Sequence, residues 1–417
     1  MYKRHITNSV IEALSDTPVV LINGARQTGK STLCKSLIQN PNLKSVFSME
    51  SMVTMDDPTT LEAATRDPLG FLKDLGKHVI IDEVQRSPEL FLPLKKLVDD
   101  DRKGRRIILT GSANVMILPK IGDSLAGRME INTLWPLSQD EISEKKSSFI
   151  NTLIDQKKSF GASATSWKEI SAMMRVGGYP ESLERTSPVR RGKWFDDYLT
   201  AILQKDIRDI SNIEGINEIP NILKLIATRV GSTINMSDIG RLAGISHTTF
   251  KRYFTLLEHI FMIVKIPAWT KNTEGQLVKS PKVYLNDTGL LNHLIGMEDE
   301  SFLDQRSNAG SFLENFVVME ILKQLTWNNN TLTPYHFSIH KGSEVDLVLE
   351  DKRGGLFGIE VKSSSTLQGK DFNGLKRLSQ LAGSKFKRGI VLYTGEQYLG
   401  GFGDNLQAVP ISSVWAS

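Results

Sequence analysis

Short runs of apolar residues alternate with amphipathic stretches through the first third of the chain. Residues 18–23, 78–82 and 106–110 are three such runs, each bounded by polar residues. Continuous apolar runs of this length are typical of strands that are covered on both faces. Their alternation with helical patterns predicts an α/β fold with a parallel sheet in this part of the chain, ending near residue 135.

The hydrophobic pattern changes twice after the predicted sheet. From residue 136 to about 230 the chain becomes helical and polar, and the sequence Gly-Gly-Tyr-Pro at 177–180 marks a break in it. The next residues fit a compact helix-turn-helix unit followed by strands, and then a helix, a hairpin and a further α/β pattern indicate a separate domain. We therefore expect four parts, with boundaries at 1–135, 136–230, 231–297 and 298–417.

The composition is that of an ordinary soluble globular protein, with 40% hydrophobic and 24% charged residues among 417. The net charge of +4 permits contact with nucleic acid but does not argue for it, because that inference needs clustered charge. The single cysteine, Cys34, excludes an internal disulfide framework and suits a reducing compartment. It falls in an expected helix, so we expect it to be packed in the core rather than to act in catalysis.

The apolar runs are too short for a membrane span, which needs about 20 residues. The richest of them, residues 260–269, is interrupted by Lys265 and Pro267. The first residues lead into an amphipathic pattern rather than a signal peptide. We therefore expect a cytoplasmic protein with no membrane partner.

A glycine-rich loop follows the first apolar run and opens a helix. Gly24, Gly29, Lys30 and Ser31 have the spacing of a phosphate loop, in the strand-loop-helix setting that this motif requires. The glycines let backbone amides point at the β-phosphate, beside the positive end of the helix. Lys30 would bridge the β- and γ-phosphates and Ser31 would bind Mg²⁺, so we expect ATP with Mg²⁺. The expected nucleotide-binding residues are Gly24, Ala25, Arg26, Gln27, Thr28, Gly29, Lys30, Ser31 and Thr32.

The second apolar run closes on Asp82 and Glu83. Residues at the carboxyl end of this strand lie beside the first loop, because parallel strands end at the same edge of a sheet. Asp82 would hold Mg²⁺ through water, and Glu83 would orient or activate the attacking water. A helix N-cap is the structural alternative for this acidic pair, and the presence of the phosphate loop about 50 residues earlier favours the functional interpretation.

Further polar residues are candidates for completing the nucleotide site. Ser112 or Asn114, after the third run, would report the loss of the γ-phosphate, unless they are an ordinary polar strand end. Arg128 follows a glycine and would act as an arginine finger on a neighbouring subunit, or else form a surface ion pair. Arg4 and Arg26 are candidates for contacts to the phosphates or the base.

A hairpin near the C-terminus sets two acids opposite each other. Residues 344–350 and 356–362 each place three apolar side chains on one face, Val345, Leu347 and Leu349 in the first strand and Phe357, Ile359 and Val361 in the second. The five-residue loop between them pairs Glu350 with Leu356. That register sets Asp346 across from Glu360, with Cβ atoms about 5 Å apart.

Like charges at that distance are unfavourable unless a positive charge lies between them. A divalent metal ion would supply it, and Lys362 would orient a water or steady developing negative charge. Glu314, in an apolar helix, would supply a third carboxylate. The structural alternative is a charged solvent face on which Lys362 neutralises its neighbours.

The middle of the chain carries a helix-turn-helix pattern. Ser237 is expected to cap a short helix, Gly244 to make the turn and Ser246 to cap a longer helix, with residues 261–285 as a wing. The early part of the second helix is where DNA contacts are made in such units, although winged helices also serve as protein-packing modules. The candidate DNA-binding residues are His247, Thr248, Thr249, Lys251 and Arg252.

Taken together, these motifs resemble a prokaryotic AAA+ ATPase family whose members carry a C-terminal domain of uncharacterised function. The resemblance covers nearly the whole chain, although Ser31 stands where threonine is commoner. It implies an AAA+ ATPase domain at 1–135, a helical lid at 136–230, a winged helix at 231–297 and a PD-(D/E)xK nuclease-like domain at 298–417. The segments that carry it are residues 24–32, 81–85, 109–113, 125–128, 177–180, 284–289, 312–316, 344–346 and 360–362.

The expected function is an oligomeric ATPase that couples ATP turnover to DNA. In this interpretation the nuclease-like domain engages duplex or branched DNA, or cuts it with metal held by Asp346 and Glu360. The alternative is a nucleotide-dependent switch that responds to a protein partner and uses its C-terminal domain for binding alone. A third possibility is a passive DNA binder whose ATPase only sets its oligomeric state.

Overall fold

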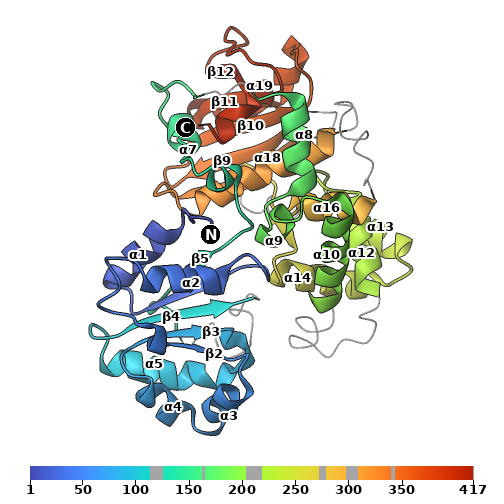
Figure 1. Ribbon diagram of the computed structural model, residues 1–417. Helices are drawn as coiled ribbons and strands as arrows, with labels where there is room; N and C mark the ends of the chain where they lie inside the picture. Colours follow the sequence, from blue (N-terminus) through green and yellow to red (C-terminus); the bar gives the residue numbers. More distant parts are fainter. Residues whose placement is uncertain are drawn as a thin grey trace.

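The computed structural model describes residues 1–112, 125–161, 165–202, 218–271, 279–296, 309–339 and 343–416. An N-terminal α/β body and a C-terminal α/β body lie at opposite ends of the molecule, with helices of the middle region beside and between them (Figure 1). The N-terminus lies between the two bodies. Within these residues, no helix has the length and apolar character needed to cross a membrane.

The N-terminal body contains a five-stranded sheet, and all its strands are parallel. The strand order is β2-β3-β4-β1-β5, so the strand before the phosphate loop lies between two others. This confirms the parallel α/β sheet that the alternating apolar runs predict. The strands are β1 Val19–Asn23, β2 Met52–Thr54, β3 His78–Asp82, β4 Arg106–Gly111 and β5 Met129–Thr133.

Helices cover both faces of this sheet because successive strand residues point to opposite sides. Val19 and Leu21 of β1 pack with one set of helices, α3 Pro58–Arg66, α4 Pro68–Asp74 and α5 Phe91–Asp100. Val20 and Ile22 pack with the other set, α1 Thr7–Asp16 and α2 Lys30–Ile38. Cys34 is fully buried in this second cluster, and burial raises the pKa of its thiol, as expected for a packing residue.

Between the first sheet and the middle helices, the chain packs on the C-terminal body. α7 Phe149–Ile154 contacts α18 Gly310–Leu325, and the Arg388 guanidinium donates to the carbonyl of Thr152 at 2.7 Å. One hydrophobic cluster runs from Phe149 to Trp415, so the middle helices and the C-terminal body share a core. The other helices of this region are α6 Gln139–Ile142, α8 Trp167–Val176, α9 Pro180–Leu183, α10 Pro188–Ala201, α12 Ile219–Ala227 and α16 Thr288–Ile295.

The helix-turn-helix consists of α13 Met236–Leu242 and α14 His247–His259, with Gly244 at φ 70° in the turn. Ser246 caps α14 by accepting the amide of Thr249, as predicted. The predicted cap at Ser237 is wrong, because the Asn235 side chain accepts the amides of Ser237 and Asp238 instead. β6 Ile263–Ile266 pairs antiparallel with β7 Lys282–Leu285 where the wing was expected.

The C-terminal body is built on a five-stranded sheet of order β12-β11-β10-β9-β8. The predicted pairing of Glu350 with Leu356 is confirmed. α18 covers one face and α19 Asn373–Ala382 covers the other. The strands are β8 Leu332–Ile339, β9 Ser343–Asp351, β10 Leu356–Lys362, β11 Phe386–Tyr393 and β12 Leu406–Pro410.

One detail of the predicted hairpin is wrong. Leu347 and Leu349 pack toward α18, but Val345 packs in the cluster under α19. The register of β8 against β9 shifts between Tyr335 and Phe337, which marks a β-bulge. A bulge adds a residue to one strand and breaks the strict alternation of faces that the prediction assumed.

Candidate functional site

The phosphate loop has the backbone conformation that its glycines permit. Gly24 has φ 145° and Gly29 has φ 94°, values that side chains disfavour. A Cβ atom on Gly24 would also lie 2.1 Å from the carbonyl oxygen of Leu134, so no larger residue fits there. The loop is therefore held close to the segment that follows β5.

Lys30 begins α2 directly after Gly29 and is 5% exposed. Its ammonium donates to the carbonyl oxygens of Gly24 at 3.0 Å and Ala25 at 2.9 Å. These acceptors are neutral oxygens of the same loop. Phosphate oxygens bind an ammonium more strongly than neutral carbonyls do, because charge-assisted hydrogen bonds are stronger.

Ser31 and Asp82 meet at the carboxyl edge of the sheet, as the prediction requires. The Ser31 hydroxyl donates to Asp82 Oδ2 at 2.8 Å, and the hydroxyl of Thr110 donates to the other oxygen of the same carboxylate. A hydroxyl and a carboxylate are the hard oxygen donors that Mg²⁺ prefers, so this pair fits a magnesium ion. Thr110 was missed as a site residue, although it opens the polar group that ends the third apolar run.

Glu83 follows Asp82 in a left-handed conformation, with φ 56°. This conformation is uncommon for a residue other than glycine and clusters at functional sites. The Gln85 side-chain amide donates to the Glu83 carboxylate and to Ser112 Oγ, the latter at 2.9 Å. Gln85 therefore links the two predicted residues and was missed by the sequence analysis. The other candidate at this strand end, Asn114, lies outside the described residues.

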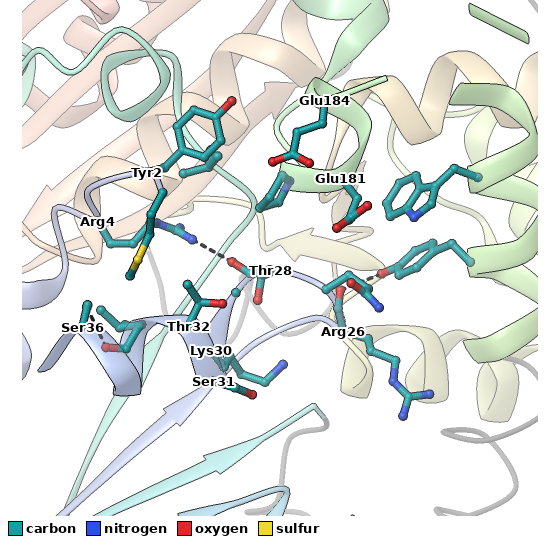
Figure 2. Close-up of a pocket in the computed structure, with 18 of the residues that line it drawn as sticks. Tyr2, Arg4, Arg26, Thr28, Lys30, Ser31, Thr32, Ser36, Glu181 and Glu184 are labelled. Carbon is teal, nitrogen blue, oxygen red and sulfur yellow. Dashed lines mark hydrogen bonds between the residues drawn. The ribbon is translucent and has the colours of Figure 1, made fainter. Parts of the chain in front are cut away.

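The phosphate loop opens into a cavity of about 830 Å³. Pockets of roughly 300–1,000 Å³ hold ligands of nucleotide size. Figure 2 shows Glu181 and Glu184, from α9 and the residues after it, on the opposite side of this space from the loop. Further parts of the wall come from the N-terminal segment, from Asp56 and Glu83, and from Trp194 and Tyr198 of α10.

Arg4 braces the phosphate loop. Its guanidinium donates to the carbonyls of Thr28 and Trp135, both at 2.7 Å, and to Glu141 at 3.1 Å. These bonds commit the buried cation to the protein itself. Arg4 therefore braces the loop, and its contact with the phosphates or the base stays a prediction, since it also lines the cavity.

Arg128 lies at the opposite edge of the sheet from the phosphate loop of its own chain, immediately before β5. Its guanidinium binds the Asp99 carboxylate through two bonds, at 2.5 and 3.0 Å. This is the surface ion pair that the sequence offered as the alternative to an arginine finger. Any contact of Arg128 with nucleotide would come from a second copy of the chain.

A chain of buried hydrogen bonds leads from the phosphate loop into the middle region. The Tyr198 hydroxyl donates to the carbonyl of Arg26 at 3.2 Å and lies 2.8 Å from the hydroxyl of Tyr179. The Asn286 side chain donates to Tyr179 at 2.8 Å. Asn286 directly follows β7, so this strand is connected to the nucleotide loop through two tyrosines.

The glycines at 177 and 178 explain how this junction closes. A Cβ on Gly177 would lie 2.2 Å from the Asp287 carboxylate, and one on Gly178 would lie 2.1 Å from the carbonyl oxygen of Leu137. The Gly178 amide donates to Asp287 at 2.6 Å. The segments 177–180 and 284–289 thus pack closely against each other.

The other end of β7 enters the C-terminal body at Lys282, which is 1% exposed. Its ammonium lies 2.9 Å from Asp346 Oδ1 and 2.8 Å from Glu314 Oε1, and it also contacts the Glu344 carboxylate. Lys362 pairs with Glu360 at 2.6 Å. We refer to Lys282, Glu314, Glu344, Asp346, Glu360 and Lys362 as the carboxylate centre.

Burial and charge shift the titration of the carboxylate centre. Burial, assisted by the charge of Asp346, raises the pKa of Glu314 to about 8. The same two causes raise the pKa of Glu360 well above its usual range. Burial alone would lower the pKa of Lys282, but the charges of Asp346, Glu314 and Glu344 raise it above its ordinary value.

The structure brings the predicted acids together but with a cation that the sequence analysis missed. The Asp346 carboxylate also accepts the amide of Val361 at 2.9 Å, next to Glu360. Among the residues described, no group of three or more His, Cys, Asp or Glu side chains has the arrangement of a metal site. The sequence offered one signal for this cation, namely that Lys282 is a lysine within the predicted wing.

Four of the five candidate DNA-binding residues form an exposed stripe on α14. His247, Thr248, Lys251 and Arg252 are exposed in its first half. Thr249 is half-buried, and its hydroxyl lies 2.8 Å from the capping Ser246. Thr249 therefore stabilises the helix end rather than extending this stripe.

Comparison with known proteins adds a family match for the N-terminal body. Residues 16–143 match the AAA domain family, which supports a P-loop domain of the AAA+ kind in this part of the chain. Residues 168–301 and 309–414 match two families that are each described as a domain of unknown function.

Similar proteins extend over most of the chain. An uncharacterized protein of Mycobacterium tuberculosis is 28% identical over 402 residues, covering 96% of this chain and 82% of the relative. Solved structures that match parts of the chain include Aeropyrum pernix ORC2 in ADPNP and ADP complexes (14% identity, TM-score 0.34, covering 73% of this chain and 93% of that one). AMPPCP-bound DnaA from Aquifex aeolicus is another (16% identity, TM-score 0.29, covering 60% and 86%). Likeness at this level says nothing about the ligands of this chain.

Proposed function

We propose that the protein binds and hydrolyses ATP with Mg²⁺ at the phosphate loop and couples this turnover to DNA binding by the middle region. The observation that carries the ATPase part is the meeting of Lys30, Ser31, Asp82 and Glu83 at one edge of the sheet. The hydroxyl of Ser31 lies 2.8 Å from Asp82, and the pocket beside them is of nucleotide size.

The proposed roles follow from the contacts of each side chain. Lys30 exchanges its loop carbonyls for β- and γ-phosphate oxygens, since these carry the charge that neutral carbonyls lack. Ser31 binds Mg²⁺ directly and Asp82 binds it through water. Glu83, held by Gln85, orients the attacking water, and Ser112 senses the γ-phosphate through the same amide. An oligomer would allow Arg128 to leave Asp99 and reach the nucleotide of a neighbour.

DNA binding is assigned to α14 because its exposed residues combine two cations with hydrogen-bonding side chains. His247, Thr248, Lys251 and Arg252 lie in the half of the second helix that contacts DNA in helix-turn-helix proteins. The pair of β6 and β7 would serve as the wing, and the C-terminal sheet would add a nuclease-like surface for DNA. No cleavage step is assigned, because Lys282 already neutralises the carboxylate centre.

The test is the rate of ATP hydrolysis with and without single-stranded, duplex and branched DNA. Lys30→Ala should abolish hydrolysis, whereas Lys35→Ala, an exposed position on the same helix, should leave it unchanged. Lys251→Ala with Arg252→Ala should remove any DNA effect and keep the basal rate. Unchanged turnover with every DNA, together with stimulation by a protein fraction, would favour the alternative of a switch for a protein partner.

A further inference from the structure

Lys282 has an unusual set of contacts for a strand residue. It begins β7 in the middle region, yet its side chain is buried against carboxylates of the C-terminal body. Its ammonium lies 2.8 Å from Glu314 on α18 and 2.9 Å from Asp346 on β9, and it touches Glu344. Tyr284, two residues further along β7, donates its hydroxyl to Glu314 at 2.7 Å.

The charges at this centre need a cation. The Asp346 carboxylate accepts the amide of Val361, next to Glu360, and Glu314 and Glu344 add two further acids around Lys282. Carboxylates so close to one another are unfavourable without a positive group between them. Lys362 serves Glu360 at 2.6 Å, so Lys282 is the cation that serves the other three.

We propose that Lys282 is the resident cation of the carboxylate centre and that a divalent metal ion binds there only when this ammonium is absent. An ammonium and a divalent ion would compete for the same carboxylate oxygens, because like charges cannot share them. The oxygen donors themselves suit a hard divalent cation.

A second observation supports latent metal capacity at this place. Glu360 is 7% exposed, and its Oε2 atom has no hydrogen-bond partner among the described residues. Buried polar atoms are normally satisfied, so an oxygen of this kind marks a position where a further ligand is accepted. The ion pair of Lys282 with Asp346 holds β7 against the C-terminal sheet.

The contacts also explain why sequence reasoning placed a metal ion here. The predicted acids lie close together, but β7 delivers a cation from a segment 64 positions before Asp346. This inference concerns the C-terminal body alone. It does not depend on ATP hydrolysis at the phosphate loop, so either proposal can fail without the other.

The test is Mn²⁺ titration of the full chain without nucleotide, followed by calorimetry and by the midpoint of thermal unfolding. Lys282→Met should bind one Mn²⁺ at least about tenfold more tightly than the parent, and its unfolding midpoint should rise by several degrees with Mn²⁺. Lys282→Arg should behave as the parent does, because it keeps the charge. Lys279→Met is the matched control, since the Lys279 ammonium contacts only the Ser338 carbonyl in the described bonds.

Asp346→Asn in the Lys282→Met background should abolish the gain in Mn²⁺ affinity. A Lys282→Met protein that folds and gains no Mn²⁺ site would overturn the proposal. If Lys282→Met does not fold, the parent decides the question. One Mn²⁺ bound tightly to the parent and lost in Asp346→Asn would overturn the proposal, and absence of such an ion would support it.

Discussion

One buried lysine lies in the N-terminal body and another is buried against the C-terminal body, and the partners of the two differ in charge. Lys30 donates to two backbone carbonyls of its own loop, at 3.0 and 2.9 Å, beside a cavity of about 830 Å³. Lys282 is surrounded by the carboxylates of Glu314, Glu344 and Asp346. The first lysine donates to neutral carbonyls that a phosphate can replace, whereas the second contacts three acidic side chains.

The phosphate loop can therefore accept an added ligand, whereas the carboxylate centre already contains its cation, the ammonium of Lys282. A ligand at the phosphate loop gains charge-assisted bonds that the carbonyls do not offer. A cation entering the carboxylate centre must instead displace an ammonium that is already bound by opposite charges. Similar residue types therefore lead to opposite expectations for added ligand at the two ends of the molecule.

A single strand lies between these two sites. β7 carries Lys282 and Tyr284 into the carboxylate centre, and Asn286 after it reaches the phosphate loop through Tyr179 and Tyr198. A change at the loop is therefore connected to the carboxylate centre by buried hydrogen bonds. Four predictions test how far the two sites differ and whether this connection matters.

The largest expected effect is the loss of stability in Lys282→Met. Removing one member of a buried ionic group leaves unbalanced charge, which costs about 3–5 kcal/mol. Urea unfolding should show this loss, and adding Asp346→Asn should recover part of it because one of the acids is then neutral. Lys279→Met should change stability by less than about 0.5 kcal/mol, as surface substitutions do. An equal loss in both single variants would contradict the special position of Lys282.

At the other site, Glu83→Gln should slow ATP hydrolysis by about 100-fold or more and preserve ATP binding. The substitution keeps the shape of the side chain but removes the carboxylate that orients water. Single-turnover hydrolysis and binding of a fluorescent ATP analogue measure the two effects separately. Glu89→Gln, a nearby exposed position, is the control. Loss of ATP binding in Glu83→Gln would show that this carboxylate has a structural role instead.

The stability of the protein should depend on pH through His336, which lies near the carboxylate centre. Burial lowers the pKa of His336 to about 4, and His336 bonds to the carbonyl of Ser280, two residues before Lys282. In an unfolded chain the pKa is about 6.5, so between these values the unfolded state binds more protons. Stability from this group is therefore present above the unfolded pKa and falls as the pH drops, by about 1.4 kcal/mol per pH unit.

His336→Asn should remove this dependence, because asparagine does not titrate and still offers a donor to Ser280. Urea unfolding at several pH values between about 6.5 and 4.5 should show the parent losing stability faster than the variant. ATP binding at about neutral pH should be the same in both proteins. Parallel pH profiles for parent and variant would rule out this assignment.

The smallest expected effect belongs to Tyr198→Phe, which breaks the link between the two sites. Losing one buried hydroxyl should cost about 1 kcal/mol. Hydrogen exchange should show that ATP protects the amides of β7 less in the variant than in the parent. Tyr398→Phe is the matched control, since it removes a hydroxyl that bonds to Ser413 within the C-terminal body. Unchanged protection in Tyr198→Phe would mean that this chain carries no coupling.

The sequence predicted best those features that depend on neighbours along the chain. The phosphate loop, the three apolar strands and the pairing of Glu350 with Leu356 follow from local spacing, and the sheets confirm the strands and the register. Ser31 and Asp82 meet because parallel strands bring their carboxyl ends to one edge. β2 and β5 were not predicted, because β2 has three residues and both strands are partly exposed, so neither forms a clear apolar run.

The features that the sequence missed depend on contacts between distant segments. Gln85 was read as part of a motif, and only the structure brings its amide to Glu83 and Ser112. Lys282 meets Asp346 across 64 positions, and no periodicity reveals which distant acids a lysine will meet. The bulge in β9 likewise depends on its partner strand, which is why Val345 was assigned to the wrong face.

The contrast between the two lysines is tested most directly by counting bound Mn²⁺ with electron paramagnetic resonance. The parent is measured with and without a non-hydrolysable ATP analogue. We predict one Mn²⁺ per chain with the analogue, lost in Asp82→Asn, and no tightly bound Mn²⁺ without it. A nucleotide-independent Mn²⁺ that disappears in Asp346→Asn would contradict the account, because the carboxylate centre would then hold a metal ion despite Lys282.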